Sequence, residues 1–267
     1  MAATAVILIA WVTATPAAER VIDPTVSPAD RGRAIAEEVE RRDEGFGSSA
    51  AELVMTLTNA EGRERTRRLT WKMLEADAPG EGDKSLTVFK EPRDIEGTAV
   101  LSHTYVDRDD DQWLYLPSLK RVKRISSANK SSAFVGSEFA YEDLLSDEVE
   151  KFDYLWLRNE ACSVWQCYLV ERRPRYTNSG YARQLVWVDQ EEFRPIRIEF
   201  YDRKNRHQKT LVFEEYRRYL DRFWRAHGMR MDNHQTGKTT VLSFSAFEFQ
   251  IGLTARNFDP GVLHRLR

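Results

Sequence analysis

The chain has 267 residues, of which 42% are hydrophobic and 31% charged, and its formal net charge is −2. This composition is typical of a globular protein, and the near-neutral charge argues against a nucleic-acid-binding protein, which would present a strongly basic surface. The aromatic content of 11%, with seven Trp, is high and indicates a wide apolar surface somewhere in the fold.

The N-terminus has the pattern of a secretory signal peptide. An apolar run at residues 5–12 is too short to span a bilayer, and small residues follow it up to Ala17 and Ala18, near which we expect cleavage. No Lys or Arg precedes the run, so the true start codon stays open, and a frayed apolar tail is the alternative. We therefore expect a signal peptide at 1–18 and a single domain at 19–267.

A helix is predicted from about Pro28 to Asp43. Ser27 precedes Pro28 in a pattern that is typical of a helix start, and Gly45 and Gly47 mark its end. The apolar stripe of this helix is thin and consists of Ala29, Ile35, Ala36 and Val39. Because a weakly apolar helix packs lightly, we expect it to be a mobile cover rather than a core element.

Beyond the helix, the sequence is dominated by alternating, strand-like runs with turn signals between most of them. About a dozen strands with local turns predict an antiparallel meander, either a large barrel or a strongly curved sheet. Most runs are polar on one face, so we expect one wet face and one face that is buried or lines a cavity. The runs are residues 52–59, 67–75, 84–91, 98–106, 112–117, 120–125, 151–157, 166–173, 182–189, 195–201, 209–216, 225–233 and 239–249.

Sequence patterns for catalysis or metal binding are absent. The five His are scattered and have no metal-binding spacing. Residues 107–111, DRDDD, look like the start of a calcium loop, but Gln112 and Ser118 stand where that loop requires Gly and Glu. The chain also lacks a nucleophile elbow. We therefore expect no metal, no cofactor and no enzymatic activity.

Two cysteines, Cys162 and Cys167, lie at the facing ends of neighbouring strand-like runs. A tight turn between two strands would bring their Cα atoms within disulfide range, and an oxidising compartment would preserve such a bond. The alternative is a pair of small, half-buried thiols on adjacent strands.

Four cations lie close together in residues 120–125: Lys120, Arg121, Lys123 and Arg124. One interpretation is a strand with a solvated face. The other is a docking patch for an anionic partner, which would be either lipid phosphates or an acidic protein surface.

Long segments of the chain then resemble a known family. DQWLYLPSLKRVKRISSANKSSAFVGSEFAYEDL, residues 111–144, resembles the signature of the LolA-like outer-membrane lipoprotein-sorting proteins. Further segments of that family are matched in the same order by residues 90–101, 185–211, 229–253 and 258–266. Together the matches extend over nearly the whole of residues 28–265.

The resemblance implies a mainly β (α+β) fold. We expect a large incomplete antiparallel β-barrel of about eleven strands, with helices covering its open side over an apolar cavity that holds acyl chains. The resemblance also implies a periplasmic protein, and many members of the family are thought to work beside inner-membrane transporters of the RND type.

The alternating faces of the strands supply candidate walls for that cavity, although in residues 112–117 either face could point inward because Trp113 and Tyr115 are also apolar. The candidate wall residues are Leu53, Met55, Leu57, Leu69, Trp71, Met73, Leu114, Leu116, Ile196, Ile198, Phe200, Leu211, Phe213, Leu242 and Phe244. The candidate lids are the helix 28–43, with Ile35 and Val39, and residues 126–144, with Phe134, Phe139 and Tyr141.

Three functions are compatible with these features. The first is a monomeric periplasmic carrier that binds acyl chains of a lipid or lipoprotein and shuttles it between the inner and outer membranes, with transient membrane contact. The second is a non-catalytic adaptor of an RND-type exporter that docks through the basic patch. The third, an enzyme on the same scaffold, would require a polar cluster in the cavity. Lys238, Ala246 and Phe247 depart from the family pattern, so the sequence does not identify the cargo. It also does not identify the proteins that would donate and accept that cargo.

Overall fold

The computed structural model describes residues 22–78 and 80–266. The predicted signal peptide, residues 1–18, lies outside the described residues. Within the described part, no helix has both the length and the apolar character needed to cross a membrane.

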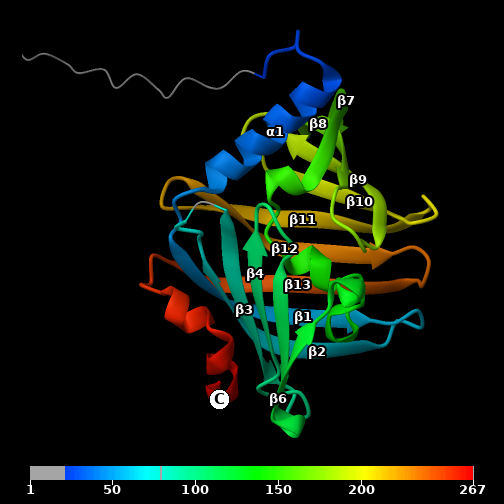
Figure 1. Cartoon of the computed structure of the whole chain (residues 1–267). Helices are drawn as coiled ribbons and strands as arrows, with labels where there is room; N and C mark the ends of the chain where they lie inside the picture. Colours follow the sequence, from blue (N-terminus) through cyan, green and yellow to red (C-terminus); the bar gives the residue numbers. More distant parts are fainter. Residues whose placement is uncertain (1–21, 79, 267) are drawn as a thin grey trace, which may run out of the picture.

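The fold is one unclosed antiparallel sheet of thirteen strands (Figure 1). The strands are β1 (Ser48–Thr58), β2 (Glu64–Leu74), β3 (Glu81–Glu91), β4 (Ala99–Tyr105), β5 (Asp111–Leu116), β6 (Arg121–Ile125), β7 (Phe152–Cys162), β8 (Trp165–Pro174), β9 (Tyr181–Asp189), β10 (Pro195–Asp202), β11 (His207–Tyr219), β12 (Phe223–Asn233) and β13 (Lys238–Phe249).

Two meanders join in the middle of this sheet. Strands β1 to β6 follow one another outward in one direction, β13 to β7 follow one another in the other, and β1 pairs with β13 between them. The edges of the sheet are therefore β6 and β7, which are consecutive in the chain. Residues 126–151, which we call the connecting segment, run from one edge to the other and carry four short 3-10 helices, η2 to η5.

The expected mainly β class is confirmed, but the expectation of about eleven strands is wrong. There are thirteen, because each strand-like run forms its own strand, including the short β6 at the edge. We also expected several helices to cover the open side of the sheet. The described residues contain a single α-helix, α1 (Pro28–Asp43), and otherwise only short 3-10 helices.

Helix α1 has the predicted bounds and lies across β7 and β8 (Figure 1). The Ser27 side chain accepts a hydrogen bond from the Asp30 amide at its start, which satisfies one of the free donors of the first turn. Its buried face contains only Gly32, Ile35 and Glu38. The Glu38 carboxylate is fully buried, and the hydrogen bonds that it accepts from Arg41 and Arg42 compensate for its desolvation.

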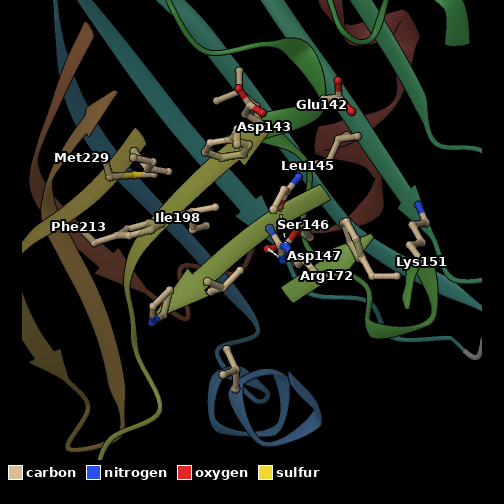
Figure 2. Close-up of a pocket in the computed structure, with 18 of the residues that line it drawn as sticks. Glu142, Asp143, Leu145, Ser146, Asp147, Lys151, Arg172, Ile198, Phe213 and Met229 are labelled. Carbon is tan, nitrogen blue, oxygen red and sulfur yellow. Dashed lines mark hydrogen bonds and ion pairs between the residues drawn. The ribbon is translucent and has the colours of Figure 1, made fainter. Parts of the chain in front are cut away.

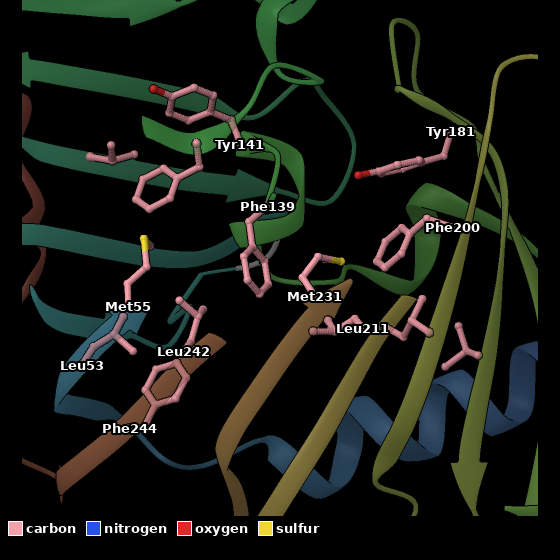
Figure 3. Packing of buried hydrophobic residues seen from close by; sticks show 14 of the residues in the cluster. Leu53, Met55, Phe139, Tyr141, Tyr181, Phe200, Leu211, Met231, Leu242 and Phe244 are labelled. Atoms are coloured by element: carbon pink, nitrogen blue, oxygen red, sulfur yellow. The ribbon is translucent and has the colours of Figure 1, made fainter. Parts of the chain in front are cut away.

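Most of the buried apolar residues form one cluster on the inner face of the sheet, beneath α1 and the connecting segment. Figure 3 shows Phe139 of the connecting segment among Met55, Met231 and Leu242 of the sheet. A second cluster lies on the outer face, where Phe258 and Leu263 of the C-terminal 3-10 helices η6 (Ala255–Phe258) and η7 (Pro260–Arg265) are fully buried against β3, β4 and β5.

The structure joins Cys162 and Cys167 in a disulfide across the β7–β8 hairpin, with their Cα atoms 5.8 Å apart. Cys167 is fully buried in a third, smaller cluster with Leu169, Trp187 and Ile196. Of the two alternatives that the sequence left open, the structure has the bonded pair.

The contact of α1 with β7 depends on Gly32, and this gives a test of the packing. A Cβ atom at position 32 would lie 2.7 Å from the backbone nitrogen of Trp156, which is closer than packing allows. Elsewhere in a helix, replacing Gly by Ala stabilises by about 1 kcal/mol. We expect Gly32→Ala to lower the free energy of unfolding by about 1–3 kcal/mol instead, because the helix must move off the strand.

Urea denaturation measures this change, with Glu37→Ala on the same helix as the matched control. Glu37 is half-exposed and pairs only with Arg33, so its removal should change stability by less than about 0.5 kcal/mol. A Gly32→Ala variant as stable as the parent would contradict the close approach of helix and strand.

Candidate functional site

A cavity of about 370 Å³ lies between the inner face of the sheet, α1 and the connecting segment, and we call it the apolar cavity. Figure 2 shows Ile198, Phe213 and Met229 of the strands on one side of it and Ser146 and Asp147 of the connecting segment on another. Because α1 forms part of the wall, a movement of α1 would open the cavity.

Most of the predicted wall residues line this cavity. They come from both meanders, which shows that the inner faces of β1 and β2 were assigned correctly, as were those of β10, β11 and β13. The residues are Leu53, Met55, Trp71, Met73, Ile198, Phe200, Leu211, Phe213, Leu242 and Phe244.

The other predicted wall residues lie elsewhere. Leu57 and Leu114 are half-buried at the margin of the main cluster, Leu69 is buried inside it, and Leu116 is half-buried at the end of β5. Leu114 does face the inner side, while Tyr115 packs under the C-terminal helices, so the ambiguous alternation of β5 is resolved.

Ile196 was placed on the wrong face by simple alternation. A β-bulge lies between Pro195 and Arg197 in the pairing of β10 with β9. Since a bulge adds one residue and shifts the alternation of side chains, Ile196 packs beside the disulfide hairpin with Leu169 and Trp187. Ile198 and Phe200, beyond the bulge, line the cavity.

Sequence reasoning missed one side of the cavity. Val170 of β8 together with Val186 and Val188 of β9 line it, as does Tyr181 at the start of β9. The alternation of Val186 and Val188 in QLVWVD was a usable signal. The polar lining residues Asp147 and Arg172, which form an ion pair at 2.7 Å, had no such signal.

The two predicted lids differ in how they are held. Ile35 and Val39 of α1 line the cavity, and so does Phe134 of the connecting segment, whereas Phe139 and Tyr141 are buried core residues outside it.

The connecting segment is held by hydrogen bonds from both halves of the sheet. The Lys209 ammonium donates to the Asp143 carboxylate at 2.6 Å and to the Glu138 carbonyl at 3.0 Å. Arg67 donates to the Val135 carbonyl at 2.6 Å. These bonds anchor the connecting segment as a fixed part of the cavity wall, so the expectation that residues 126–144 form a movable cover is wrong.

Polar groups at one end of the cavity are mutually satisfied. The Glu142 carboxylate accepts hydrogen bonds from Tyr176, Ser179 and the Gly180 amide, and burial raises the pKa of this carboxyl. Tyr181 donates to Asp143 at 2.7 Å. Because every member has a partner, this network fixes the connecting segment and resembles structural polar clusters more than a catalytic site.

One carboxyl on the lid is unusual. Glu40 of α1 lines the cavity and accepts a hydrogen bond from the Val149 amide. Burial raises the pKa of Glu40 to about 7, and repulsion from Glu148 and Glu150 contributes. Burial similarly raises the pKa of Asp83 to about 6. The described residues contain no group of three or more His, Cys, Asp or Glu side chains that could hold a metal ion.

A second, wider cavity of about 960 Å³ adjoins the first, and we call it the mouth. Ten residues line both cavities. They are Val39 and Glu40 of α1, Ser146 and Asp147 of the connecting segment, and Trp71, Met73, Pro195, Phe213, Met229 and Phe244 of the strands. The mouth extends from these to the C-terminal end of α1 and to the β11–β12 hairpin, and its outer part is charged. The apolar cavity therefore continues into a polar opening.

The basic patch lies away from both cavities. Lys120 follows the 3-10 helix η1 (Pro117–Leu119), and Arg121, Lys123 and Arg124 lie exposed on the edge strand β6. Arg124 forms an ion pair with Asp111. None of the four lines the cavity or the mouth.

Comparisons with known proteins agree with this geometry. A family model whose description reads only "uncharacterized protein" matches residues 81–265. None of the curated proteins compared matches the chain.

Among solved structures, a Vibrio parahaemolyticus domain named for outer membrane lipoprotein sorting is 51% identical, with a TM-score of 0.86, over 89% of this chain and 100% of that one. A DUF1329 family protein from Desulfovibrio piger is 30% identical, with a TM-score of 0.84 over the same shares. A LolA superfamily protein from Nitrosomonas europaea shares the fold. It is 23% identical, with a TM-score of 0.68 over 85% of this chain and 96% of that one. The chain therefore belongs to the DUF1329 family, and its fold is that of the LolA superfamily protein, in agreement with the motifs in its sequence.

Proposed function

We propose that this protein is a carrier that binds the acyl chains of a lipid or lipoprotein and shuttles them between the inner and outer membranes. The observation that carries the proposal is the cavity of about 370 Å³ under α1, which is walled mainly by aliphatic and aromatic side chains, has charged residues such as Asp147 and Arg172 at one side, and is continuous with the mouth. Its volume is within the usual range for a small-molecule pocket. The relationship to a domain named for outer membrane lipoprotein sorting supports the same class of cargo.

The energetics of acyl binding explain why one wall is a lightly packed helix. Each buried CH₂ gains about 0.8 kcal/mol, so a chain of roughly sixteen carbons gains on the order of 12 kcal/mol before costs. Binding is therefore easy and release is difficult unless the cavity opens. Helix α1, with a buried face of Gly32, Ile35 and Glu38, has few apolar contacts to break.

The periplasm is the compartment that fits this role. The Cys162–Cys167 disulfide persists in an oxidising environment, and a carrier between two membranes works in the space that separates them. The signal-peptide pattern at residues 1–18 also supports export, on sequence evidence alone.

An adaptor of an RND-type exporter is the second candidate. It is favoured by the exposed cations Lys120, Arg121, Lys123 and Arg124 beside an unpaired sheet edge. Charge reversal at these four positions should abolish capture of the transporter and leave the lipid content unchanged if docking is their role.

Native purification followed by lipid mass spectrometry tests the carrier function directly. We expect a co-purifying diacyl lipid or lipoprotein in close to stoichiometric amount, because burial of acyl chains is strongly favourable and their release into water is costly. A reproducibly empty protein that also fails to bind a fluorescent fatty acid would overturn the proposal.

A charge placed where the two cavities meet should block acyl binding. Phe213 lines both cavities and is only half-buried, so it tolerates substitution better than a core residue. We expect Phe213→Glu to weaken binding of a fluorescent fatty acid at least about tenfold, because the carboxylate must be desolvated beside the chain.

Leu220→Glu is the matched control for this variant. Leu220 is 55% exposed at the turn of the β11–β12 hairpin and lines neither cavity. Equal loss of binding in both variants, or none in Phe213→Glu, would show that the acyl chains do not occupy the apolar cavity.

The raised pKa of Glu40 predicts that the stability of the folded protein, with α1 packed on the sheet, depends on pH. The folded carboxyl titrates at about 7 against an ordinary value of 4.5, so the folded state binds more protons between these values. This contribution to stability is complete below pH 4.5 and is lost as the pH rises through 7. Relative to Glu40→Gln, we expect the free energy of unfolding of the parent to fall by about 1 kcal/mol between about pH 5 and about pH 8, after allowance for solvent screening.

Urea denaturation at the two pH values gives this difference. Glu37→Gln, on the exposed side of the same helix, should behave as the parent does. An unchanged pH dependence in Glu40→Gln would contradict the role assigned to its carboxyl.

A further inference from the structure

We propose that the mouth binds the phosphate group of a phospholipid whose acyl chains occupy the apolar cavity, through Arg218, Arg222 and Arg225. This deepens the proposed carrier function and rests on it. It narrows the cargo to a lipid with a phosphodiester headgroup.

Three arginines of one hairpin reach the mouth. The turn between β11 and β12 has the sequence RRYLDRFWR, residues 217–225, in which Leu220 and Asp221 adopt left-handed backbone conformations. Arg218, Arg222 and Arg225 line the mouth, and Arg217 does not. The Arg222 guanidinium lies over Gly45, where an added Cβ would be 3.1 Å from Nη1, so it reaches the turn between α1 and β1.

These guanidinium groups have spare hydrogen-bond donors. Arg218 and Arg222 are exposed, and their side chains contact the rings of Trp224 and Phe223, at 5.9 Å and 5.2 Å. Arg225 pairs through Nη1 with Asp43 and with the Trp224 carbonyl, but its Nη2 is buried without a hydrogen-bond partner among the described residues. Because this atom is buried, a ligand in the mouth would make no direct contact with it and would meet the exposed guanidinium groups of Arg218 and Arg222. Arg225 adds a positive charge behind them.

Carboxylates also line the mouth, and most of them already have other partners. Asp43 pairs with Arg225 and Asp147 with Arg172, while Asp83 accepts from the Ala76 amide and Glu148 from the Thr104 hydroxyl. Glu40 lines the mouth beside the apolar cavity. Glu38 is bound by Arg41 and Arg42, and Glu75 accepts hydrogen bonds from the amides of Gly45 and Gly47.

Glu192 accepts the Trp224 indole N–H at 3.0 Å. Glu44 and Glu191 are exposed at the margin and have no part in the arginine group. The hairpin side of the mouth is therefore cationic, although the opposite side, along α1, is acidic.

The path from one cavity to the other matches the shape of a phospholipid. The shared wall of Phe213, Met229 and Phe244 leads from the apolar cavity into the mouth. An acyl chain along this wall would place its headgroup beside the β11–β12 hairpin. A guanidinium matches two phosphate oxygens at once, so the arrangement recognises a phosphodiester and gives no advantage to a neutral diacylglyceryl group.

The experiment compares two lipids that share the same acyl chains. Phosphatidylglycerol and diacylglycerol are each used to displace a fluorescent fatty acid from the full mature protein. We expect phosphatidylglycerol to bind about tenfold more tightly, as one charge-assisted arginine contact is worth. In Arg218→Ala/Arg222→Ala this preference should disappear while the affinity for diacylglycerol stays the same.

Arg217→Ala/Arg230→Ala is the matched control. Arg217 adjoins Arg218 in sequence, Arg230 lies on β12, and both pair with carboxylates outside the mouth. This variant should keep the preference. Thermal melts of both variants confirm that the fold is intact, which exposed arginines do not determine.

Each result decides between the two proposals. Equal affinity of the parent for the two lipids overturns the headgroup site and leaves the carrier function standing. Failure of the fatty acid itself to bind contradicts the carrier function and removes the headgroup site with it. Inorganic phosphate is titrated alone, and binding that depends on Arg218 and Arg222 without any lipid preference would show a site for a free anion and overturn the phospholipid assignment.

Discussion

The buried ion pair between Lys209 and Asp143 is the contact on which the arrangement of the cavity depends. The two side chains are 4% and 2% exposed, with the ammonium and carboxylate 2.6 Å apart. Neither charge could be buried alone, because the desolvation penalty of each is several kcal/mol. The Ala140 amide and the Tyr181 hydroxyl donate to the same carboxylate, and the Glu138 carbonyl accepts from the ammonium. The connecting segment is thereby fixed over β11, and it covers part of the inner face of the sheet independently of α1.

The connecting segment and α1 are held differently because their polar groups lie in different surroundings. The connecting segment carries buried, fully paired charges and large aromatic side chains, and a plug of this kind comes out only if several hydrogen bonds break together. Helix α1 is held by the ion pairs Arg33–Glu150, Arg42–Glu192 and Asp43–Arg225, by Arg31 over the Trp156 ring, and by the small face around Gly32 and Ile35. Partly exposed ion pairs contribute little. The two walls of the cavity therefore differ in how they are held, and the proposed release of acyl chains would require α1, rather than the connecting segment, to move.

Much of the fold could be predicted from periodicity and much of the site could not. The bounds of α1 and the positions of all strands follow from the capping residues, the turn residues and the alternation, and most inner-face residues follow with them. Alternation failed at Ile196 because a bulge shifts the faces of β10, an irregularity with no local signature.

The connecting segment was predicted as a movable cover because its Ser and Gly content is typical of loops. Its anchors, Lys209 and Arg67, lie on distant strands and become neighbours only through the sheet order. The mouth arginines were overlooked for the same reason, since RRYLDRFWR is an ordinary hairpin until Phe213 and Phe244 are placed beside it.

The two groups of cations differ in what the fold itself explains. A sheet that does not close leaves an edge strand with unpaired backbone groups, and such an edge adds foreign strands unless charged side chains discourage it. Strand β6 is this edge, so Arg121, Lys123 and Arg124 have a structural reason to be there without any partner. Strand β7, at the other edge, is instead covered by α1. Arg225 pairs with Asp43 of α1 and so has a structural role as well. No comparable reason exists for Arg218 and Arg222, which lie on a hairpin inside the sheet order, where both neighbouring strands are paired. Charges that the fold does not require, placed where an apolar cavity opens to water, are best accounted for by a ligand, and this favours a carrier of charged lipids over an adaptor that docks through its sheet edge.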